Sequence, residues 1–125
     1  MESIEFITTY FFEKAAGIPP ETAPVWGKMS PQQMVEHLSD AVRMANGGDP
    51  QPDIVTPADR LPAVQEFLRG EREFKPNTRN SLMSDTPPAV RNQDFAAALV
   101  ELRTEVDAFV RRFEAEPGLI VRNPF

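Results

Sequence analysis

The chain has 125 residues and a mass of 14.0 kDa, the size of one ordinary domain with a single core. Hydrophobic residues make up 41% and charged residues 26%, so we expect a folded protein. The net charge of −6 disfavours nucleic acid and anionic membrane surfaces as partners. The absence of cysteine excludes disulfides, thiolate metal sites and thiol nucleophiles. The single histidine excludes a multi-histidine metal site within one copy.

Residues 1–5 carry acidic side chains where a secretory signal needs positive charge, and the chain has no apolar run long enough to span a membrane. We therefore predict a cytoplasmic protein that forms one helical domain over residues 1–125. The first predicted element is a helix that starts near Ile4 and ends before Gly17. Its aromatic and β-branched content leaves a strand as the alternative.

The next helix is predicted at about 31–46. Ser30, Pro31 and Gln33 form the pattern of a capping box with proline in the first turn, and Met29 and Met34 are spaced as a hydrophobic staple. At the other end, the sequence after Ala45 (Asn-Gly-Gly) supplies a left-handed termination and no phosphate-binding loop.

Residues 47–91 are proline-rich, and only 61–68 have a helical pattern there. Two structureless runs, about 47–57 and 74–91, are longer than the loops that join adjacent helices of a bundle. The last predicted element is a helix of about 23 residues, with Asn92 as its N-cap and Pro117 and Gly118 as its stop. Its apolar stripe consists of Phe95, Leu99, Leu102, Val106, Phe109 and Phe113. The predicted fold class is all-α.

His37 has the most informative position in the sequence. It borders the apolar stripe of the helix at 31–46 and is predicted to point toward a bundle interior. This stripe consists of Met34, Leu38, Ala41, Val42 and Ala45. Two interpretations remain open, a half-buried structural histidine or a metal ligand or acid–base group. Ser39 projects from another side of the helix, which gives no support to a serine nucleophile activated by His37.

Other polar and aromatic residues are predicted to have ordinary structural roles. Glu36 and Asp40 fall on the polar side of their helix, and Glu101 and Glu105 are expected to be exposed, although Glu105 is close to the edge of the stripe. The arginines between 60 and 91 indicate a mixed charged surface that could receive an anionic ligand. Two aromatic residues are interpreted as core-filling, Trp26 and Phe125.

Residues 26–38, WGKMSPQQMVEHL, resemble the signature of a bacterial domain family of unknown function within the DinB-like metalloenzyme superfamily. The similarity extends through the proline-rich segment and the long helix to the closing Asn123, Pro124 and Phe125. The resemblance implies a four-helix bundle with a long crossover between its second and third helices. It also implies that His37 is one of three histidine ligands of a divalent metal such as Zn, Ni, Mn or Fe.

In that family a final helix with a His-x-x-x-His arrangement follows, and this chain stops at Phe125. The last helix is therefore absent or truncated, so the domain is predicted to be incomplete at its C-terminus. We expect the uncovered apolar stripe to promote a homo-oligomer. The resemblance implies a metal-dependent enzyme that acts on a small molecule. The alternatives are a non-catalytic binding or self-assembly module and a bundle that binds an acidic ligand through Arg69 and Arg72.

Overall fold

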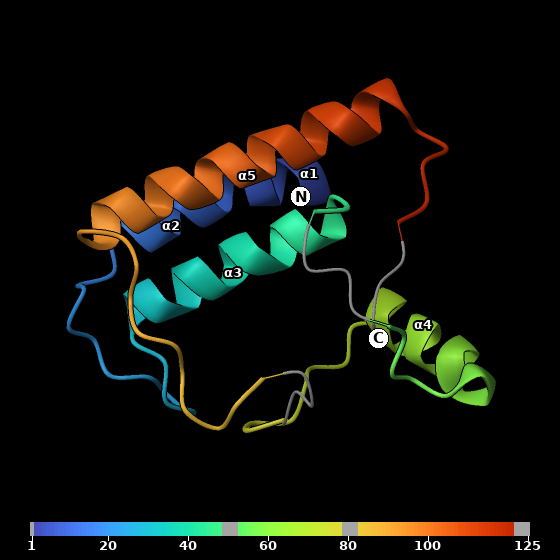
Figure 1. Cartoon of the computed structure of the whole chain (residues 1–125), viewed down its shortest axis with the longest axis horizontal. Helices are drawn as coiled ribbons and strands as arrows, with labels where there is room; N and C mark the ends of the chain where they lie inside the picture. The colour runs from blue at the N-terminus through green and yellow to red at the C-terminus, as the bar shows by residue number, and fades with distance from the viewer. Residues whose placement is uncertain (1, 49–52, 79–82, 122–125) are drawn as a thin grey trace.

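The structure is a computed structural model that describes residues 2–48, 53–78 and 83–121 (Figure 1). In these ranges the chain is helical and contains no strand, so the predicted all-α class is confirmed. The helices are α1 (Ser3–Glu5), η1 (Phe6–Tyr10), α2 (Phe11–Ala16), α3 (Pro31–Ala45), η2 (Ala58–Arg60), α4 (Leu61–Arg69) and α5 (Phe95–Ala115).

The first three elements form one continuous rod, in which η1 is a π-helical turn. The N-terminal segment is therefore a helix and the alternative of a strand is wrong. Its bulky side chains are accommodated because Phe12 and Ala15 are buried against the rest of the protein. Tertiary burial outweighs the weak strand preference of such residues.

The predicted start of α3 is confirmed in detail. The N–H of Gln33 donates to Oγ of Ser30 at 3.2 Å, and the N–H of Ser30 donates to Oε1 of Gln33 at 2.9 Å, which completes a capping box. The helix ends at Ala45, one residue earlier than predicted, and Gly47 has a φ of 84° that glycine adopts readily.

The long helix α5 begins later than predicted. Asp94 is its N-cap, because its Oδ1 accepts a hydrogen bond from the N–H of Ala97 at 2.8 Å. The prediction of Asn92 as N-cap is therefore wrong. The N–H and Nδ2 of Asn92 donate to the carboxylate of Glu36 instead. The helix ends at Ala115, just before the predicted stop at Pro117 and Gly118.

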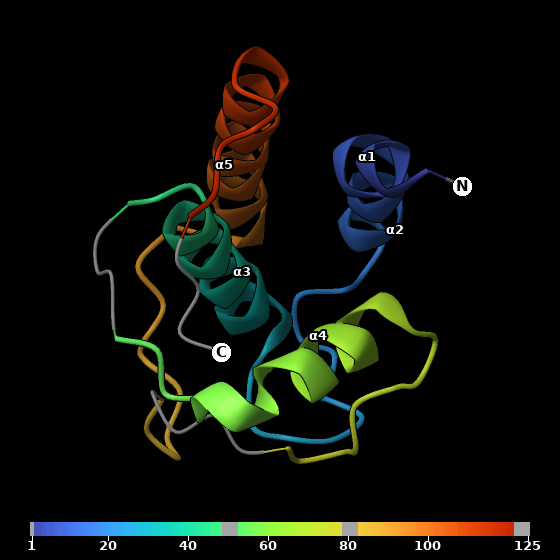
Figure 2. The same cartoon turned by 90° about the vertical axis from the view of Figure 1, so that its right-hand side faces the viewer.

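The α3 and α5 helices lie side by side and run in the same direction, while the rod of α1, η1 and α2 runs the opposite way (Figures 1 and 2). Polar contacts fix this parallel alignment. Residues 36 and 43 of α3 and its C-cap residue 46 form hydrogen bonds with residues 92, 105 and 112, in that order along the chain. The segment between α3 and α5 must return along the molecule, as the long predicted crossover requires. It carries α4, which lies across the other helices and apart from them (Figure 2).

The core lies where α5 meets both α3 and the N-terminal rod. Its buried members are Phe12, Val35, Phe95, Ala98, Leu102 and Val106. The first part of the predicted stripe on α5 is therefore covered. Phe109 and Phe113 near its end are half-buried, and their ring centroids are 4.7 Å apart. None of the described helices is long and apolar enough to cross a membrane.

Candidate functional site

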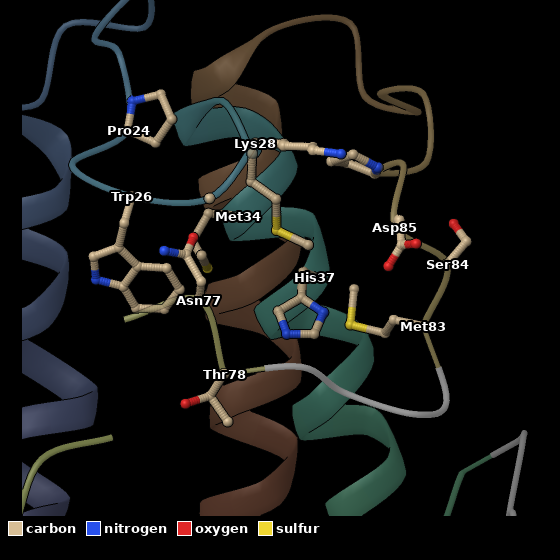
Figure 3. Close-up of a pocket in the computed structure, with 13 residues that line it drawn as sticks. Pro24, Trp26, Lys28, Met34, His37, Asn77, Thr78, Met83, Ser84 and Asp85 are labelled. Carbon is tan, nitrogen blue, oxygen red and sulfur yellow. The ribbon is translucent and has the colours of Figure 1, made fainter. Parts of the chain in front are cut away.

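A pocket with a volume of about 520 Å³ lies between α3, the loop at 24–29 and two described parts of the crossover, residues 77–78 and 83–87 (Figure 3). This volume is in the range of small-molecule sites. Its lining consists of Pro24, Trp26, Gly27, Lys28, Met29, Met34, His37, Asn77, Thr78, Met83, Ser84, Asp85 and Pro87. Thioether, aromatic and proline surface dominates, with a few polar groups among them, which is the usual composition of a ligand pocket.

His37 belongs to the wall of this pocket and is half-buried. It is two residues from both Val35 and Ser39, which are buried in the packed side of α3, so its side chain leaves the helix on the opposite side. The prediction that His37 points toward the bundle interior is therefore corrected. Figure 3 shows its imidazole facing the pocket, with the side chain of Met83 beside it.

Trp26 also differs from its predicted role. Its side chain is 49% exposed and lines the pocket, so it does not fill the core. The turn at 25–28 places its ring between the N-terminal rod and α3 (Figure 3). The other aromatic residue given a core-filling role, Phe125, lies outside the described residues.

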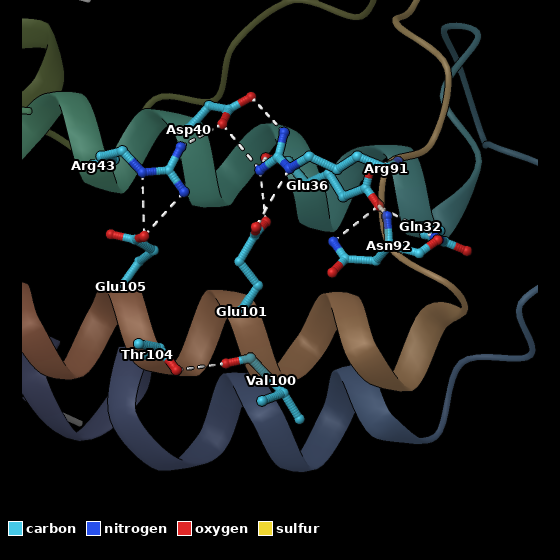
Figure 4. A network of polar contacts seen from close by, with 10 residues as sticks. All are labelled: Gln32, Glu36, Asp40, Arg43, Arg91, Asn92, Val100, Glu101, Thr104 and Glu105. Atoms are coloured by element: carbon cyan, nitrogen blue, oxygen red, sulfur yellow. Dashed lines mark hydrogen bonds and ion pairs between the residues drawn. The ribbon is translucent and has the colours of Figure 1, made fainter. Parts of the chain in front are cut away.

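The burial of Glu36 differs most from what the sequence predicts. Its predicted place was the solvated surface, but only 5% of the residue is exposed. Its carboxylate accepts hydrogen bonds from the N–H of Arg91 at 2.9 Å and the N–H of Asn92 at 3.0 Å (Figure 4). Side-chain amides of Asn92 and Gln32 donate to it at 3.1 and 3.2 Å. Four donors therefore satisfy a buried carboxylate, as its burial requires.

Burial by itself would raise the pKa of Glu36, because it penalises the charged form. The donors from Asn92, Arg91 and Gln32 favour the carboxylate and outweigh that effect, so the pKa of Glu36 lies below its ordinary value. The group is therefore ionised at neutral pH. It is a structural anion rather than a proton donor, since every contact it makes stabilises its negative form.

A network of ion pairs extends from the region of Glu36 along α3 and α5 (Figure 4). Arg91 contacts Asp40 at 3.0 Å and Glu101 at 2.6 Å, and Arg43 contacts Glu105 at 2.9 Å. Hydrogen bonds to these carboxylates raise the pKa of both guanidinium groups. Asp40 is exposed, as predicted. The side chains of the other two acids are only 26% and 22% exposed, so their predicted full exposure is wrong.

This network positions one wall of the pocket. The Nε2 of Gln33 donates to the carbonyl of Pro88 at 3.0 Å, and the Nε2 of Gln32 donates to the carbonyl of Asn92 at 2.9 Å. Together with the bonds of Glu36, these contacts hold residues 88–92 against the first two turns of α3. The neighbouring residues from Met83 to Pro87 are thereby held over the side of α3 that carries His37.

Two other predicted features do not contribute to the pocket. Ser39 is fully buried and its hydroxyl has no hydrogen-bond partner among the described residues, so it is not paired with His37. Arg69 and Arg72 are exposed and do not line the pocket, and the guanidinium of Arg72 lies over the ring of Phe67 at 5.2 Å. The structure therefore does not bring these arginines to His37.

A divalent metal needs about three protein ligands in a stable site. Among the residues that the structure describes, no group of three His, Asp or Glu side chains is arranged to hold one. The residues around His37 do not fit the metal centre that the family resemblance implies. A divalent metal bound through His37 stays a prediction.

Comparison with protein-family models, characterised proteins and solved structures finds no match to this chain. The DinB-like resemblance therefore rests on the residues of the sequence alone. Neither it nor the homo-oligomer is supported by a relative.

The site also contains residues that the sequence analysis did not anticipate. Glu36 was assigned to the surface, and Met83 and Asn77 were not singled out. The spacing of Met29 and Met34 predicted a hydrophobic staple at the start of α3, and both residues line the pocket. No sequence signal indicated that Met83, far along the crossover, would join them.

Proposed function

We propose that this chain is a helical binding protein that takes a small ligand into the pocket around His37. The observation that supports this proposal is the position of His37, the only histidine of the chain, on the wall of a pocket of about 520 Å³ whose surface is mostly apolar. An imidazole in such a wall is a directional polar contact that can donate or accept a hydrogen bond. Among the described residues, no hydrogen bond occupies it.

The pocket favours a ligand with a flat apolar body. Trp26 and the methionines offer polarisable contact surface, and methionine adapts its shape to irregular partners. Lys28 and Asp85 lie at the wall with opposite charges, so the pocket has no strong preference for one sign.

The long crossover supports the DinB-like four-helix-bundle type as the ancestry of this fold. A long connection between the second and third main helices is what the resemblance implies. The resemblance also keeps a divalent-metal enzyme as the second candidate, with His37 as its one identified ligand. Metal analysis of the purified protein and of His37→Ala separates the two. A stoichiometric divalent metal that is lost in the variant would favour the enzyme.

An environment-sensitive naphthalene-sulfonate dye tests the binding function directly. Trp26 is the only tryptophan and lines the pocket, so a dye bound there will quench its emission by energy transfer. We expect saturable binding of one dye per chain. His37→Ala should weaken it several-fold, while Val100→Ser, at a site 67% exposed on α5, serves as the matched control.

The proposal is wrong if the dye binds without saturation, or if His37→Ala and Val100→Ser bind it equally. Circular dichroism of each variant shows whether the helices are intact. Any loss of dye binding can then be assigned to the pocket and not to unfolding.

A further inference from the structure

Sulfur is concentrated in the pocket around His37. Three of the five methionines of the chain, Met29, Met34 and Met83, line it together with the only histidine. Thioethers and imidazole are ligands of soft or borderline metal ions, and thioethers in particular select Cu(I). The chain has no cysteine, so these four side chains are the soft ligands that the described part of this pocket offers.

Local sequence brings three of them together. Met34 precedes His37 by three residues, so the two side chains are neighbours on one side of α3. Met29 immediately precedes the N-cap Ser30 and lines the same wall. The crossover supplies the fourth, and Figure 3 shows the thioether of Met83 next to the imidazole.

We infer that Met29, Met34, His37 and Met83 form a binding site for a soft monovalent metal ion, of which Cu(I) is the biological example. This inference goes beyond the proposed function, because it adds a metal ion to the ligands that the same pocket takes. The three rotatable bonds of each methionine let its sulfur adjust toward a common ion.

The charge and hardness of the ligands favour a monovalent ion over a divalent one. Thioether and neutral imidazole ligands carry no negative charge, so they offset little of a double positive charge. Hard divalent cations prefer several oxygen ligands, and the lining contains one carboxylate, Asp85. The pocket therefore suits an ion whose affinity depends on sulfur.

Silver(I) is a suitable probe because it shares the preference for thioethers and needs no reductant. We would titrate silver nitrate, in chloride-free buffer, into the full chain labelled with ¹³C at the methionine methyl groups. The methyl signals of Met29, Met34 and Met83 and the ring signals of His37 should shift together and saturate at one ion per chain. Met44 does not line the pocket, and its signal should not move. Cu(I) added without oxygen should give the same pattern.

Conservative variants separate coordination from packing. Met83→Leu keeps an apolar side chain of similar size but removes the sulfur, so it should weaken silver binding by roughly tenfold or more. Met44→Leu is the matched control and should bind silver like the natural chain. Equal affinity in the two variants, or a shift of Met44 as large as those of the pocket methionines, would overturn the inference.

Two further outcomes distinguish this inference from the proposed function. Saturable dye binding without a silver-induced shift would leave the pocket function intact and remove the soft-metal site. If the protein shows neither saturable dye binding nor a silver-induced shift, both the proposed function and the soft-metal site are wrong. Saturation by zinc(II), with shifts at His37 and none at the methionine methyls, would assign a divalent site and would also overturn the inference.

Discussion

The carboxylate of Glu36 accepts a hydrogen bond from the backbone N–H of Asn92 at 3.0 Å, which ties the second turn of α3 to the residues that lead into α5 (Figure 4). The two residues are 56 positions apart. Because α3 and α5 run in parallel, the chain must travel the length of the molecule between them. The contact between Glu36 and Asn92 fixes the end of this crossover beside the second turn of α3. It thereby fixes the register of the two longest helices, α3 and α5.

Glu36→Gln should destabilise the fold by about 2 kcal/mol, because hydrogen bonds to a charged group are stronger than those to a neutral one. The new amide also carries an NH₂ group that faces donors rather than acceptors. Urea denaturation followed by circular dichroism measures the change in the free energy of unfolding.

The control for this change is Glu66→Gln, at an exposed position on α4. It should alter the free energy of unfolding by less than about 0.5 kcal/mol. If the two variants are equally stable, the Glu36 contacts do not hold the crossover in solution.

The lowered pKa of Glu36 also predicts a pH dependence. In the unfolded chain this carboxyl group has the ordinary pKa of a glutamate, and in the native state its pKa is lower. The native state therefore binds this proton less readily, and the resulting stabilisation is complete above the unfolded pKa. It is lost as the pH falls through the native pKa.

The difference in unfolding free energy between the natural chain and Glu36→Gln should accordingly be largest near neutral pH and shrink below pH about 4. Denaturant titrations of both proteins over this range measure it. A difference that stays constant down to the lowest pH would mean that the Glu36 charge does not contribute.

Local signals in the sequence predicted most of the helices. The capping box at Ser30 and Gln33, the stop before Pro117 and the stripe on α5 all depend on residues within a few positions of each other. The helix boundaries predicted from these signals agree with the structure to within a few residues. The long proline-rich crossover also indicated that α3 and α5 are not hairpin neighbours.

Errors arose where a distant partner changes the environment of a residue. Glu36 is on the polar side of an isolated helix, and only the return of Asn92 buries and satisfies it. The α5 helix begins at Phe95, so Asp94 and not Asn92 is its N-cap, and the Oδ1 of Asp94 accepts a hydrogen bond from the N–H of Ala97. His37 was assigned to the interior because it borders the apolar stripe of its helix, but the side of α3 that packs against α5 carries the buried residues Val35 and Ser39 and lies opposite His37.

Ser39→Ala should stabilise the protein by about 1 kcal/mol, because the natural hydroxyl is buried with no hydrogen-bond partner in the described part of the chain and alanine favours helix. The measurement is again the midpoint of urea denaturation at constant slope. Ser30→Ala is a matched change of the same chemistry at the N-cap of α3. It should destabilise by about 1 kcal/mol, since it removes the bond to Gln33. A destabilising Ser39→Ala would show that the hydroxyl has a partner in solution, such as a buried water.

The predicted homo-oligomer stays a prediction, but the structure changes the surface that would mediate it. Much of the α5 stripe is covered, whereas the N-terminal rod exposes Ile4, Phe6 and Tyr10 to 48%, 43% and 38%. Neighbouring exposed apolar residues of this size favour association. We therefore expect sedimentation equilibrium at high concentration to give a mass above the 14.0 kDa of one chain.

In Phe6→Ser the mass should return toward that of the single chain, because the substitution removes the central aromatic ring of the exposed group. Leu68→Ser, at a site 59% exposed on α4, is the control and should associate like the natural protein. A single-chain mass for the natural protein at every concentration would remove the prediction. An equal effect of both variants would mean that association depends on general apolar exposure and that the N-terminal rod is not its specific interface.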